Sequence, residues 1–479
     1  MSRRCINLPV YNLILCSFFI IISSSFNVRA EVETRDDQMW SSGSLVKKKD
    51  ERQLISSSEY GEISSVGIEI PTDLSSYNIQ SITMVSSAIF LPVVLSSDMV
   101  FYVQTGSGSL SYTSNEGRLQ TRKLKQGDVF GLNPGDVFFI QSCLCTDKLQ
   151  IHAIFGDLEE GFRQPAASGP YSSFRNMLLR FNKKILQETF KVSPGVIDEL
   201  FNAPNPPAFV PAVSKTWELE ANFIRWFSEG FLGDSAALFN ILTVYRDSEN
   251  RNGWITTSNK KKRPVEYLKG LLSPKKFGVF MANLSSGSMV APHWNPMATE
   301  IAIVLQGKGM VRVVCSSLNN FAYEKSRRCE DTRFQVEEGD VFVVPRLHPT
   351  AQMSFGDDTF VFMGFSTETK MKKSGNHEFL VGKVSIFRAL GRSVLAASLG
   401  VNETMINEIL RSQLGESAVL GCNLCAEEEL RIMEEEMEKA EQEETGAGEG
   451  EEEPGKEEVT PGEEGSGNTG PDESLWAED

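Results

Sequence analysis

The amino-acid sequence predicts a mainly β protein with two similar antiparallel barrels or sandwiches, each followed by helices, and a disordered acidic C-terminal tail. Short apolar stretches broken by turn residues run from Gln80 to Phe155, and the same pattern returns over residues 277 to 365. Short apolar runs bounded by Gly, Pro, Asn and Asp are typical of antiparallel β structure. A helical pattern follows each stretch, so we expect one architecture repeated twice.

The two β-rich stretches align with each other. FYVQTGSGSL (101–110) parallels AIVLQGKGMV (302–311), and QGDVFGLNPGDVFFI (126–140) parallels EGDVFVVPRLHPTAQ (338–352). Counted between the same glycines, 32 residues in the second copy against 21 in the first, the second copy is longer by 11 residues. The insertion carries Cys315 and Cys329 at what should be a hairpin tip. We favour a disulfide between them that pins this loop.

The helical segments are duplicated as well. Residues 183–201 align without a gap with residues 392–410, and both stretches indicate a helix, a short connection and a second helix. Ser193 and Asn402 occupy the same place before the second helix, where a side-chain oxygen can cap the first turn. Pro194 then stands at a first-turn position that tolerates proline.

Composition divides the chain into six segments. Arg3 and Arg4, an apolar run and a small-residue end at Ala30 are typical of a secretory signal peptide. No other apolar run is long enough to cross a bilayer, so we expect no membrane partner. The predicted segments are a signal peptide (1–30), a polar segment (31–55), a first β domain with helical extension (56–205), a linker with a helix and a basic loop (206–265), a second such domain (266–425) and an acidic low-complexity tail (426–479).

The net charge of −17 is carried by the tail. Residues 426–479 hold 22 acidic and 3 basic side chains, a balance of −19. The body is therefore close to neutral and gives no electrostatic reason to expect nucleic-acid binding. Residues EEELRIMEEEMEKAEQEE at the start of the tail are compatible with a solvated helix, whereas the Gly, Pro and Glu-rich remainder has almost nothing apolar to bury.

One cluster of polar residues stands out in a chain with only four histidines. His293, Asn295 and Glu300 lie between Gly287 and Gly307 in the order G-x5-H-x-N-x4-E-x6-G. Imidazole nitrogen and carboxylate oxygen are suitable ligands for zinc, copper, manganese or iron. The spacing resembles the first of the two motifs of the cupin family, with Asn295 where a second histidine is usual.

The second cupin motif is also present in an altered form. After Gly339, five residues lead to Pro345, as in that motif. Leu347 then stands where glycine is usual, and Thr350 stands where the motif's histidine is usual. His348 comes two residues early.

The duplication, the helical extensions and the phrases FGVFMANLSSGSMVAPHWN and GDVFVVP resemble the vicilin, or 7S seed globulin, branch of the two-domain cupins. The resemblance covers residues 56 to 420. It implies two jelly-roll barrels, a homotrimer assembled through the helical extensions, and deposition in protein storage vacuoles as a seed reserve. It also implies no catalytic residues and no required cofactor, with processing and mobilising proteases as partners. Secretion to the outside of the cell is the alternative location.

A metal site in the second barrel is the sharpest site hypothesis. Its ligands would be His293, Glu300 and His348, with Asn295 as a weaker fourth, and it would hold one divalent ion of zinc, copper, manganese or iron. The alternatives are that the two histidines are hydrogen-bonded remnants of an ancestral site, or that the pocket binds a small organic anion. His152 and His377 are expected to have ordinary structural or surface roles.

The first barrel provides an internal test of the metal hypothesis. Val93, Leu95 and Met99 stand at its three first-motif ligand positions, and Asp136 stands opposite His348. Three apolar side chains cannot hold a cation, so we expect this interior to be packed core.

Two sequons and the remaining cysteines complete the candidate sites. Asn283-Leu-Ser and Asn402-Glu-Thr are glycosylation sequons. Asn402 is expected to be exposed at a helix cap, whereas Asn283 sits at a strand end. Cys422-Asn-Leu-Cys425 has a CxxC spacing but no partner pair for a zinc site. The pairing of Cys143, Cys145, Cys422 and Cys425 stays open.

Three functions follow in order. The first is a seed storage globulin that packs densely and later yields its amino acids, with no catalysis. The second is a binding cupin that holds a metal or small ligand in the second barrel. The third is a germin-like metal-dependent oxidase, against which the missing second histidine and the apolar first barrel argue.

Overall fold

A computed structural model describes residues 45–70, 75–113, 118–144, 147–156, 170–212, 239–257, 277–315, 331–367, 377–382, 385–413 and 418–446. Several predictions fall outside these ranges and remain predictions. They concern the signal peptide (1–30), the linker helix and basic loop (within 213–238 and 258–276), the cysteines Cys145 and Cys329, and the tail after residue 446.

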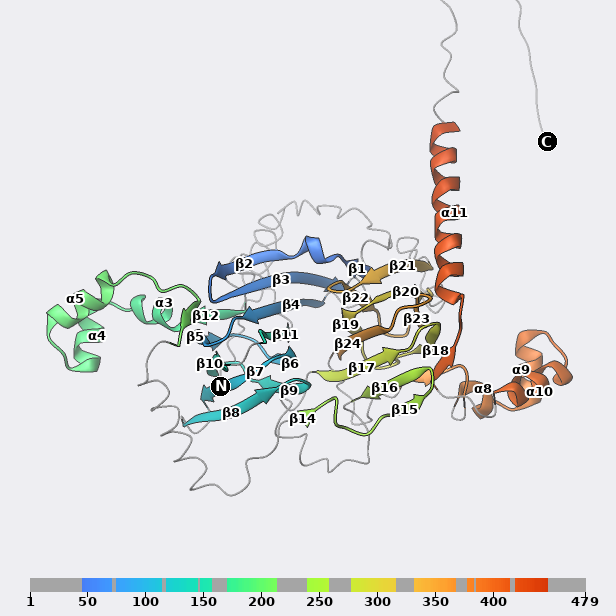
Figure 1. The fold of residues 1–479 in the computed structure, drawn as a ribbon, viewed down its shortest axis with the longest axis horizontal. Coiled ribbons are helices and arrows are strands. Elements are labelled where there is room, and N and C mark those ends of the chain that lie inside the picture. Colours follow the sequence, from blue (N-terminus) through green and yellow to red (C-terminus); the bar gives the residue numbers. More distant parts are fainter. Residues whose placement is uncertain are drawn as a thin grey trace, which may run out of the picture. The chain divides into compact units, whose positions relative to one another are not determined.

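The N-terminal barrel consists of two facing antiparallel sheets (Figure 1). One sheet has the order β12 (Tyr171–Ser173), β5 (Ala88–Leu95), β10 (Val137–Ser142), β7 (Ser107–Thr113) and β8 (Leu119–Lys125), with β13 (Phe209–Pro211) also pairing with β5. The other has the order β14 (Phe239–Asn240), β9 (Asp128–Leu132), β6 (Met99–Thr105), β11 (Leu149–Phe155), β4 (Ser75–Met84), β3 (Gly61–Ile70) and β2 (Gln53–Ser58).

Alternation along the strands builds two separate apolar layers. In β6, Met99, Phe101 and Val103 point into the barrel and belong to its core, together with aromatic residues such as Phe138. Val100 and Tyr102 point to the opposite face and join a cluster formed mainly by the second barrel. The seven-stranded sheet of the first barrel is therefore apolar on both faces.

The C-terminal barrel repeats this plan. One sheet has the order β1 (Val46–Lys47), β22 (Val341–Val344), β19 (Glu300–Gln306), β24 (Phe360–Ser366), β17 (Gly278–Leu284), β16 (Gly253–Thr257) and β15 (Ser248–Asn250). The other has the order β21 (Thr332–Glu337), β20 (Lys308–Val313), β23 (Thr350–Ser354), β18 (Ser288–Trp294) and β25 (Glu378–Phe379), with β26 (Val419–Gly421) also pairing with β18.

Each barrel receives a short edge strand from the beginning of the other repeat. β1, at the start of the first repeat, pairs with β22 of the second barrel, and β14, at the start of the second repeat, pairs with β9 of the first barrel. Both additions are held by the same aspartate of the GDVF motif. Asp340 accepts from Lys48 Nζ at 2.8 Å, and Asp128 accepts from Asn240 Nδ2 at 2.8 Å. The exchange ties the two repeats together reciprocally.

This exchange corrects two predicted boundaries. Residues 206–265, predicted to be a linker, contribute β13 and β14 to the first barrel and β15 and β16 to the second. The segment 31–55, predicted to be polar and outside both domains, contributes β1, the 3-10 turn Lys49–Glu51 and the start of β2. Strands of two or three residues show no readable periodicity, which is why composition placed these segments outside the barrels.

The helical extensions match each other as the alignment predicted. The first contains α3 (Phe174–Leu179), α4 (Lys183–Phe190) and α5 (Pro194–Asn202), and the second contains α8 (Ile386–Ala389), α9 (Arg392–Leu399) and α10 (Glu403–Ser412). Asn402 caps α10 by accepting from the Met405 N–H at 2.9 Å. Ser193 is the N-cap residue of α5, but its side chain makes no capping bond.

Helix α11 (Cys425–Gly446) follows the second extension and confirms the predicted helix at the start of the acidic tail. Its first turn packs on the C-terminal barrel, where Ala426 is buried with Met310 and Met353. Glu427 accepts from the Gly356 N–H at 2.7 Å. Residues from Arg431 onward form a separate unit. Among the described residues no helix is both long and apolar enough to cross a bilayer.

Cysteines of the mature body form disulfides. Cys422 and Cys425 are joined, with 5.5 Å between their Cα atoms. Cys315 and Cys143 are also in disulfides. β20 and β21 pair up to Val313 and Thr332, so the inserted loop does lie at a hairpin tip. The partner proposed for Cys315, Cys329, lies outside the described residues, and that pairing stays a prediction.

Candidate metal site in the C-terminal barrel

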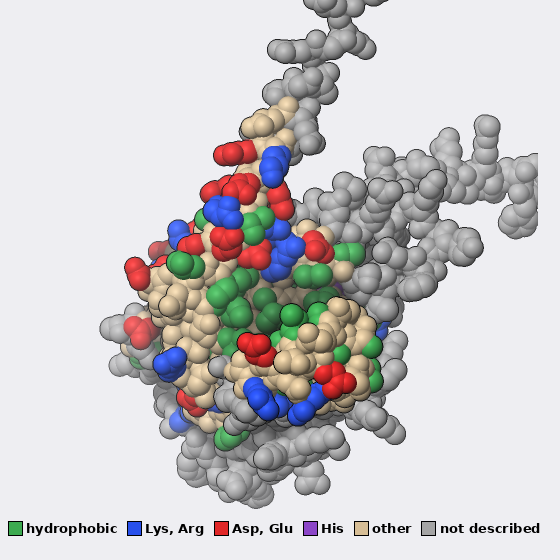
Figure 2. Space-filling model, turned by 90° about the vertical axis from the view of Figure 1, so that its right-hand side faces the viewer, with side chains coloured by type: hydrophobic (Ala, Val, Ile, Leu, Met, Phe, Trp, Pro, Cys, Tyr) green, Lys and Arg blue, Asp and Glu red, His purple; other side chains and the backbone are tan. Residues whose placement is uncertain are grey.

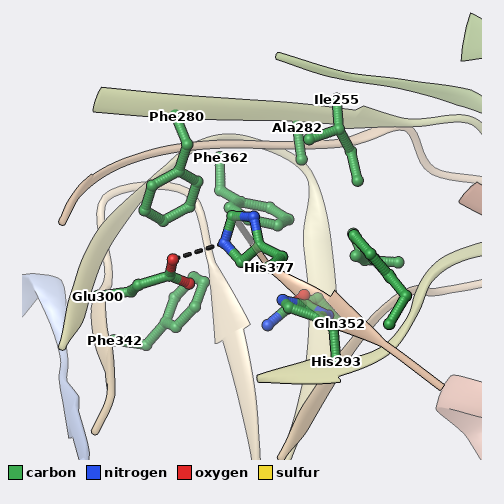
Figure 3. A pocket seen from close by; sticks show the side chains of 11 residues that line it. Ile255, Phe280, Ala282, His293, Glu300, Phe342, Gln352, Phe362 and His377 are labelled. Atoms are coloured by element: carbon green, nitrogen blue, oxygen red, sulfur yellow. Dashed lines mark hydrogen bonds and ion pairs between the residues drawn. The ribbon is translucent and has the colours of Figure 1, made fainter. Parts of the chain in front are cut away.

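A small pocket lies inside the C-terminal barrel (Figure 3). Its free space of about 20 Å³ is enough for one water molecule or one ion and too small for an organic substrate. Most of its wall is aromatic and aliphatic, and its polar members are two histidines, one glutamate and one glutamine. The lining residues are Ile255, Phe280, Ala282, Val290, His293, Glu300, Phe342, Gln352, Phe362, His377 and Phe379.

His293 comes from β18, where the alternation of the strand turns it inward. Its Nδ1 lies 2.8 Å from the Ala291 carbonyl oxygen. A carbonyl only accepts, so Nδ1 carries the proton and Nε2 keeps its lone pair, which is the form that binds metals. Burial, with the nearby charge of His377, lowers the pKa of His293 to about 4. The side chain is therefore neutral at physiological pH.

Glu300 is the first residue of β19 and is only 3% exposed. Its Oε1 accepts from Asn295 Nδ2 at 2.8 Å and from His377 Nε2 at 2.5 Å. Burial by itself would raise the pKa of Glu300, but the charge and hydrogen bond of His377, with His293 and Asn295, outweigh it and hold the pKa below its usual value. The carboxylate is therefore ionised inside the barrel.

His377 is the third member of the cluster, and its role was predicted wrongly. We expected a structural or surface role for it, but it lies just before β25 and reaches into the pocket beside Glu300 (Figure 3). Its ring centroid is 5.0 Å from that of His293, with the planes at 86°. One donor atom from each of His293, Glu300 and His377 lies within 4.8 Å of the others. No sequence motif marks His377, and the only hint is the rarity of histidine in this chain.

His348 is the corresponding correction, because it does not line the pocket. It is buried, and its Nδ1 donates to the Arg346 carbonyl oxygen at 3.0 Å. It lies on the turn that precedes β23, so the inward strand positions fall to Thr350 and Gln352 instead. The three-residue site predicted as His293, Glu300 and His348 therefore becomes His293, Glu300 and His377.

Asn295 is also unsuited to the ligand role proposed for it. Its Oδ1 accepts from the backbone N–H groups of Met297 and Ala298, both at 3.0 Å, and its Nδ2 donates to Glu300. Both ends of the amide are therefore engaged. Asn295 orients Glu300 and closes the turn before β19.

The three side chains fit a divalent metal ion in kind and in place. Two imidazoles and one carboxylate are a donor set used by zinc, iron and related ions, and donors 2.0–2.2 Å from an ion stand up to about 4 Å apart. The spread of 4.8 Å needs only a small movement. A proton now lies between His377 and Glu300, and an ion would have to take its place.

The same location in the N-terminal barrel is filled with hydrocarbon, as predicted. Val93, Leu95 and Met99 are 7%, 2% and 0% exposed and belong to the core of that barrel. Asp136 accepts from the Asn133 N–H at 2.9 Å and so closes a turn. Among the described residues, the His-Glu-His cluster of the second barrel has no counterpart in the first.

The sequence profile of the cupin family matches residues 47–198 and 239–407. A vicilin-like seed storage protein of Arabidopsis thaliana is 39% identical over 424 residues, which cover 83% of this chain and 78% of that protein. A second vicilin-like seed storage protein of the same plant is 38% identical over 462 residues, which cover 92% of this chain and 61% of that protein.

Solved structures show the same fold. Vicilin from Capsicum annuum superposes with a TM-score of 0.64 at 19% identity, over 79% of this chain and 99% of that one. Bacillus subtilis oxalate decarboxylase, described with Mn(II) centres, superposes with a TM-score of 0.60 at 16% identity, over 79% of this chain and 88% of that one. Identities this low establish the architecture alone.

Proposed function

This chain belongs to the cupin family and, within it, to the vicilin-like seed storage proteins, and from this premise we propose that it is a storage globulin whose function is to be an amino-acid reserve. The observation that carries the proposal is the 39% identity to a seed storage protein across 83% of the chain, both barrels included. Such a protein needs dense packing and resistance to unfolding, and it needs no catalytic step.

The interiors of both barrels support storage over catalysis. The first is filled by side chains, and the free space in the second is about 20 Å³. An enzyme acting on an organic substrate needs a pocket of roughly 300 Å³ or more. The likeness to oxalate decarboxylase is one of fold. We therefore propose no reaction for this chain.

The test of the storage role is abundance through the life of the seed. Quantitative proteomics should find the protein among the abundant proteins of the mature seed and should find it falling steeply during germination. A scarce protein, or one whose level is unchanged while other reserves disappear, would contradict the proposal. The predicted signal peptide supports delivery to protein storage vacuoles, and fluorescence from a fusion carrying residues 1–30 against one lacking them tests that delivery.

Assembly into a homotrimer is proposed from the helical extensions. Each extension buries one face, Leu186 and Ile197 in the first and Leu395 and Ile406 in the second. The opposite faces expose apolar side chains at equivalent positions of the two copies. These pairs are Ile185 and Val394, Phe190 and Leu399, and Val196 and Met405, and each side chain is between 47% and 57% exposed. Hydrophobic side chains also gather in a hollow of the described surface (Figure 2).

Two equivalent apolar faces on one chain suit a ring, in which the first extension of one copy meets the second extension of the next. Light scattering after size exclusion should give three chains per particle, and Val394→Glu should give monomers. Glu408→Lys changes charge at an exposed position of the same extension and should leave the trimer intact. A monomeric wild-type protein at micromolar concentration would refute this assembly.

A second function, binding of one divalent cation, is favoured by the buried cluster of His293, Glu300 and His377. An ion bound there would act as a Lewis acid or a structural cross-link. Metal analysis of protein purified without chelator should find up to one ion of zinc, copper, manganese or iron per chain. His377→Ala should lose it, whereas His348→Ala, which removes a buried histidine outside the pocket, should retain it. Equal metal content in both variants would exclude this site.

A further inference from the structure

The disulfide between Cys422 and Cys425 has an unusual position. Cys422 directly follows β26, and Cys425 is the first residue of the 22-residue helix α11. Only Asn423 and Leu424 lie between them, and Leu424 is 71% exposed. Both cysteines are half-buried. The bond is thus accessible, and it stands at the N-terminal end of a long helix.

A structural role explains this disulfide poorly. The stabilisation that a disulfide provides grows with the length of the loop it closes, and this loop is among the shortest. The segment is also held by other contacts. Cys422 donates its N–H to the Gly287 carbonyl oxygen at 2.7 Å, β26 pairs with β18, and Glu427 accepts from the Gly356 N–H at 2.7 Å. The segment therefore has its own anchors on both sides of the disulfide.

We propose that Cys422–Cys425 is a thiol–disulfide exchange site that accepts two electrons from a dithiol protein. A donor thiolate attacks Sγ of Cys422, because Cys425 packs against the apolar cluster of Met310, Met353 and Ala426 and is the inner of the two sulfurs. The bond between the cysteines breaks, and Cys425 leaves as a thiolate. The second donor thiol then attacks the mixed disulfide, releases Cys422 as a thiol and leaves the donor oxidised.

The helix end favours this step. The first N–H groups of α11 have no carbonyl of the preceding turn to bind, and the helix dipole places partial positive charge at its N-terminus. Both effects stabilise a thiolate at Cys425, as they do at other helix-terminal cysteines. Of the acidic residues nearby, Glu427 is engaged with Gly356 and Glu429 with Arg333 at 3.6 Å. Glu428 also stands in the first turn and opposes the thiolate.

Reduction should therefore be local and reversible. The anchors of β26 and α11 do not involve the two sulfurs, so the barrel is expected to keep its fold as the dithiol. The exposed Leu424 gives a donor protein an apolar contact beside the bond it attacks. The site goes beyond storage, because it makes the chain a participant in dithiol–disulfide chemistry.

The test uses the full-length native protein and dithiothreitol as the dithiol. Samples taken over time are alkylated and mapped by mass spectrometry. We expect Cys422 and Cys425 to become labelled at least about tenfold faster than Cys143 and Cys315, and we expect this difference to disappear in denaturant. Labelling of all four cysteines at one rate in the native protein, or slower labelling of Cys422 and Cys425, would overturn the proposal.

Two further measurements separate exchange chemistry from mere exposure. In the reduced protein, the alkylation rate of Cys425 should titrate below about pH 8.5, the ordinary value of a free thiol. Glu428→Gln should lower this midpoint and speed reduction, whereas Glu438→Gln, farther along the same helix, should change neither. A Cys425 thiol that titrates at or above the ordinary value in the wild type and in Glu428→Gln would also overturn the proposal.

Discussion

The two barrels of this chain share one backbone plan but fill the same internal position in opposite ways. In the first, Met99 is buried among hydrocarbon side chains, and in the second, Glu300 is buried at the equivalent place. Glu300 is tolerated because its partners are complete: Asn295 and His377 donate to it. The difference teaches that a jelly-roll interior accepts either chemistry, provided that a polar side chain comes with every partner it needs.

The largest effect is expected from moving the charge alone into the first barrel. Met99→Glu places a carboxylate at a fully buried site among apolar residues, without the amide and imidazole that surround Glu300. Loss of packing and an unpaired buried charge should together cost about 5 kcal/mol or more of unfolding free energy. Denaturant unfolding measures the change. Met99→Leu, which keeps the volume, should cost less than about 1.5 kcal/mol, and equal effects of the two substitutions would contradict this account.

The histidines of the two halves differ as well, and His152 gives the next effect. It faces away from the core of the first barrel, between Ser81 and Gln104, with Arg52 bonded to the same Ser81 hydroxyl. Burial, and then the charge of Arg52, lowers the pKa of His152 to about 3. The unfolded chain binds the proton at an ordinary value near 6.5, so the contribution of His152 is complete above pH 6.5 and is lost as the pH falls toward 3.

The expected loss over this range is about 2–4 kcal/mol, since each unit of pKa difference is worth about 1.4 kcal/mol and the denatured chain is not a free peptide. Unfolding free energies measured from pH 7 to pH 4 should fall more steeply for the wild type than for His152→Gln, which keeps hydrogen-bonding groups but does not titrate. Parallel curves would show that His152 takes up its proton as readily in the folded state as in the unfolded one.

The two helical extensions offer a smaller contrast at equivalent caps. Asn402 accepts a capping hydrogen bond from Met405, whereas the Ser193 side chain makes none. Asn402→Ala should therefore cost about 1 kcal/mol, and Ser193→Ala should cost less than about 0.5 kcal/mol. Thermal or denaturant unfolding of the pair provides the measurement. A loss at Ser193 as large as that at Asn402 would mean that the Ser193 hydroxyl contributes in another way.

The smallest effect concerns a turn that both barrels contain. Gly135 in the first barrel has a φ of 89°, and Leu347, its equivalent in the second, has a φ of 68°. Side chains disfavour this left-handed region, so Leu347→Gly should stabilise the protein by up to about 1 kcal/mol. Gly135→Leu should destabilise it by a similar amount. If Leu347→Gly instead lowers the unfolding free energy, the half-buried leucine side chain contributes more than its backbone strain costs.

Much of the architecture could be predicted because the signal is local and appears twice. The helices of the extensions begin at Lys183 and Arg392, which the gapless alignment pairs with each other. The hydrocarbon interior of the first barrel followed from Val93, Leu95 and Met99 at the motif positions. The short exchanged strands β1 and β14 escaped prediction, because two residues carry no periodicity and their pairing partners lie in the other repeat.

The sequence by itself determined the duplication, the β class, the helical extensions and two of the three side chains at the candidate site, His293 and Glu300, because each depends on spacing within a short segment. Only the tertiary structure decided the third. His348 is five residues from a β23 position that lines the pocket but stays on a turn, while His377 reaches Glu300 across 77 positions of sequence. Which histidine enters the barrel depends on where the chain returns after the last strand of the sheet, and that path is set by packing rather than by any local pattern.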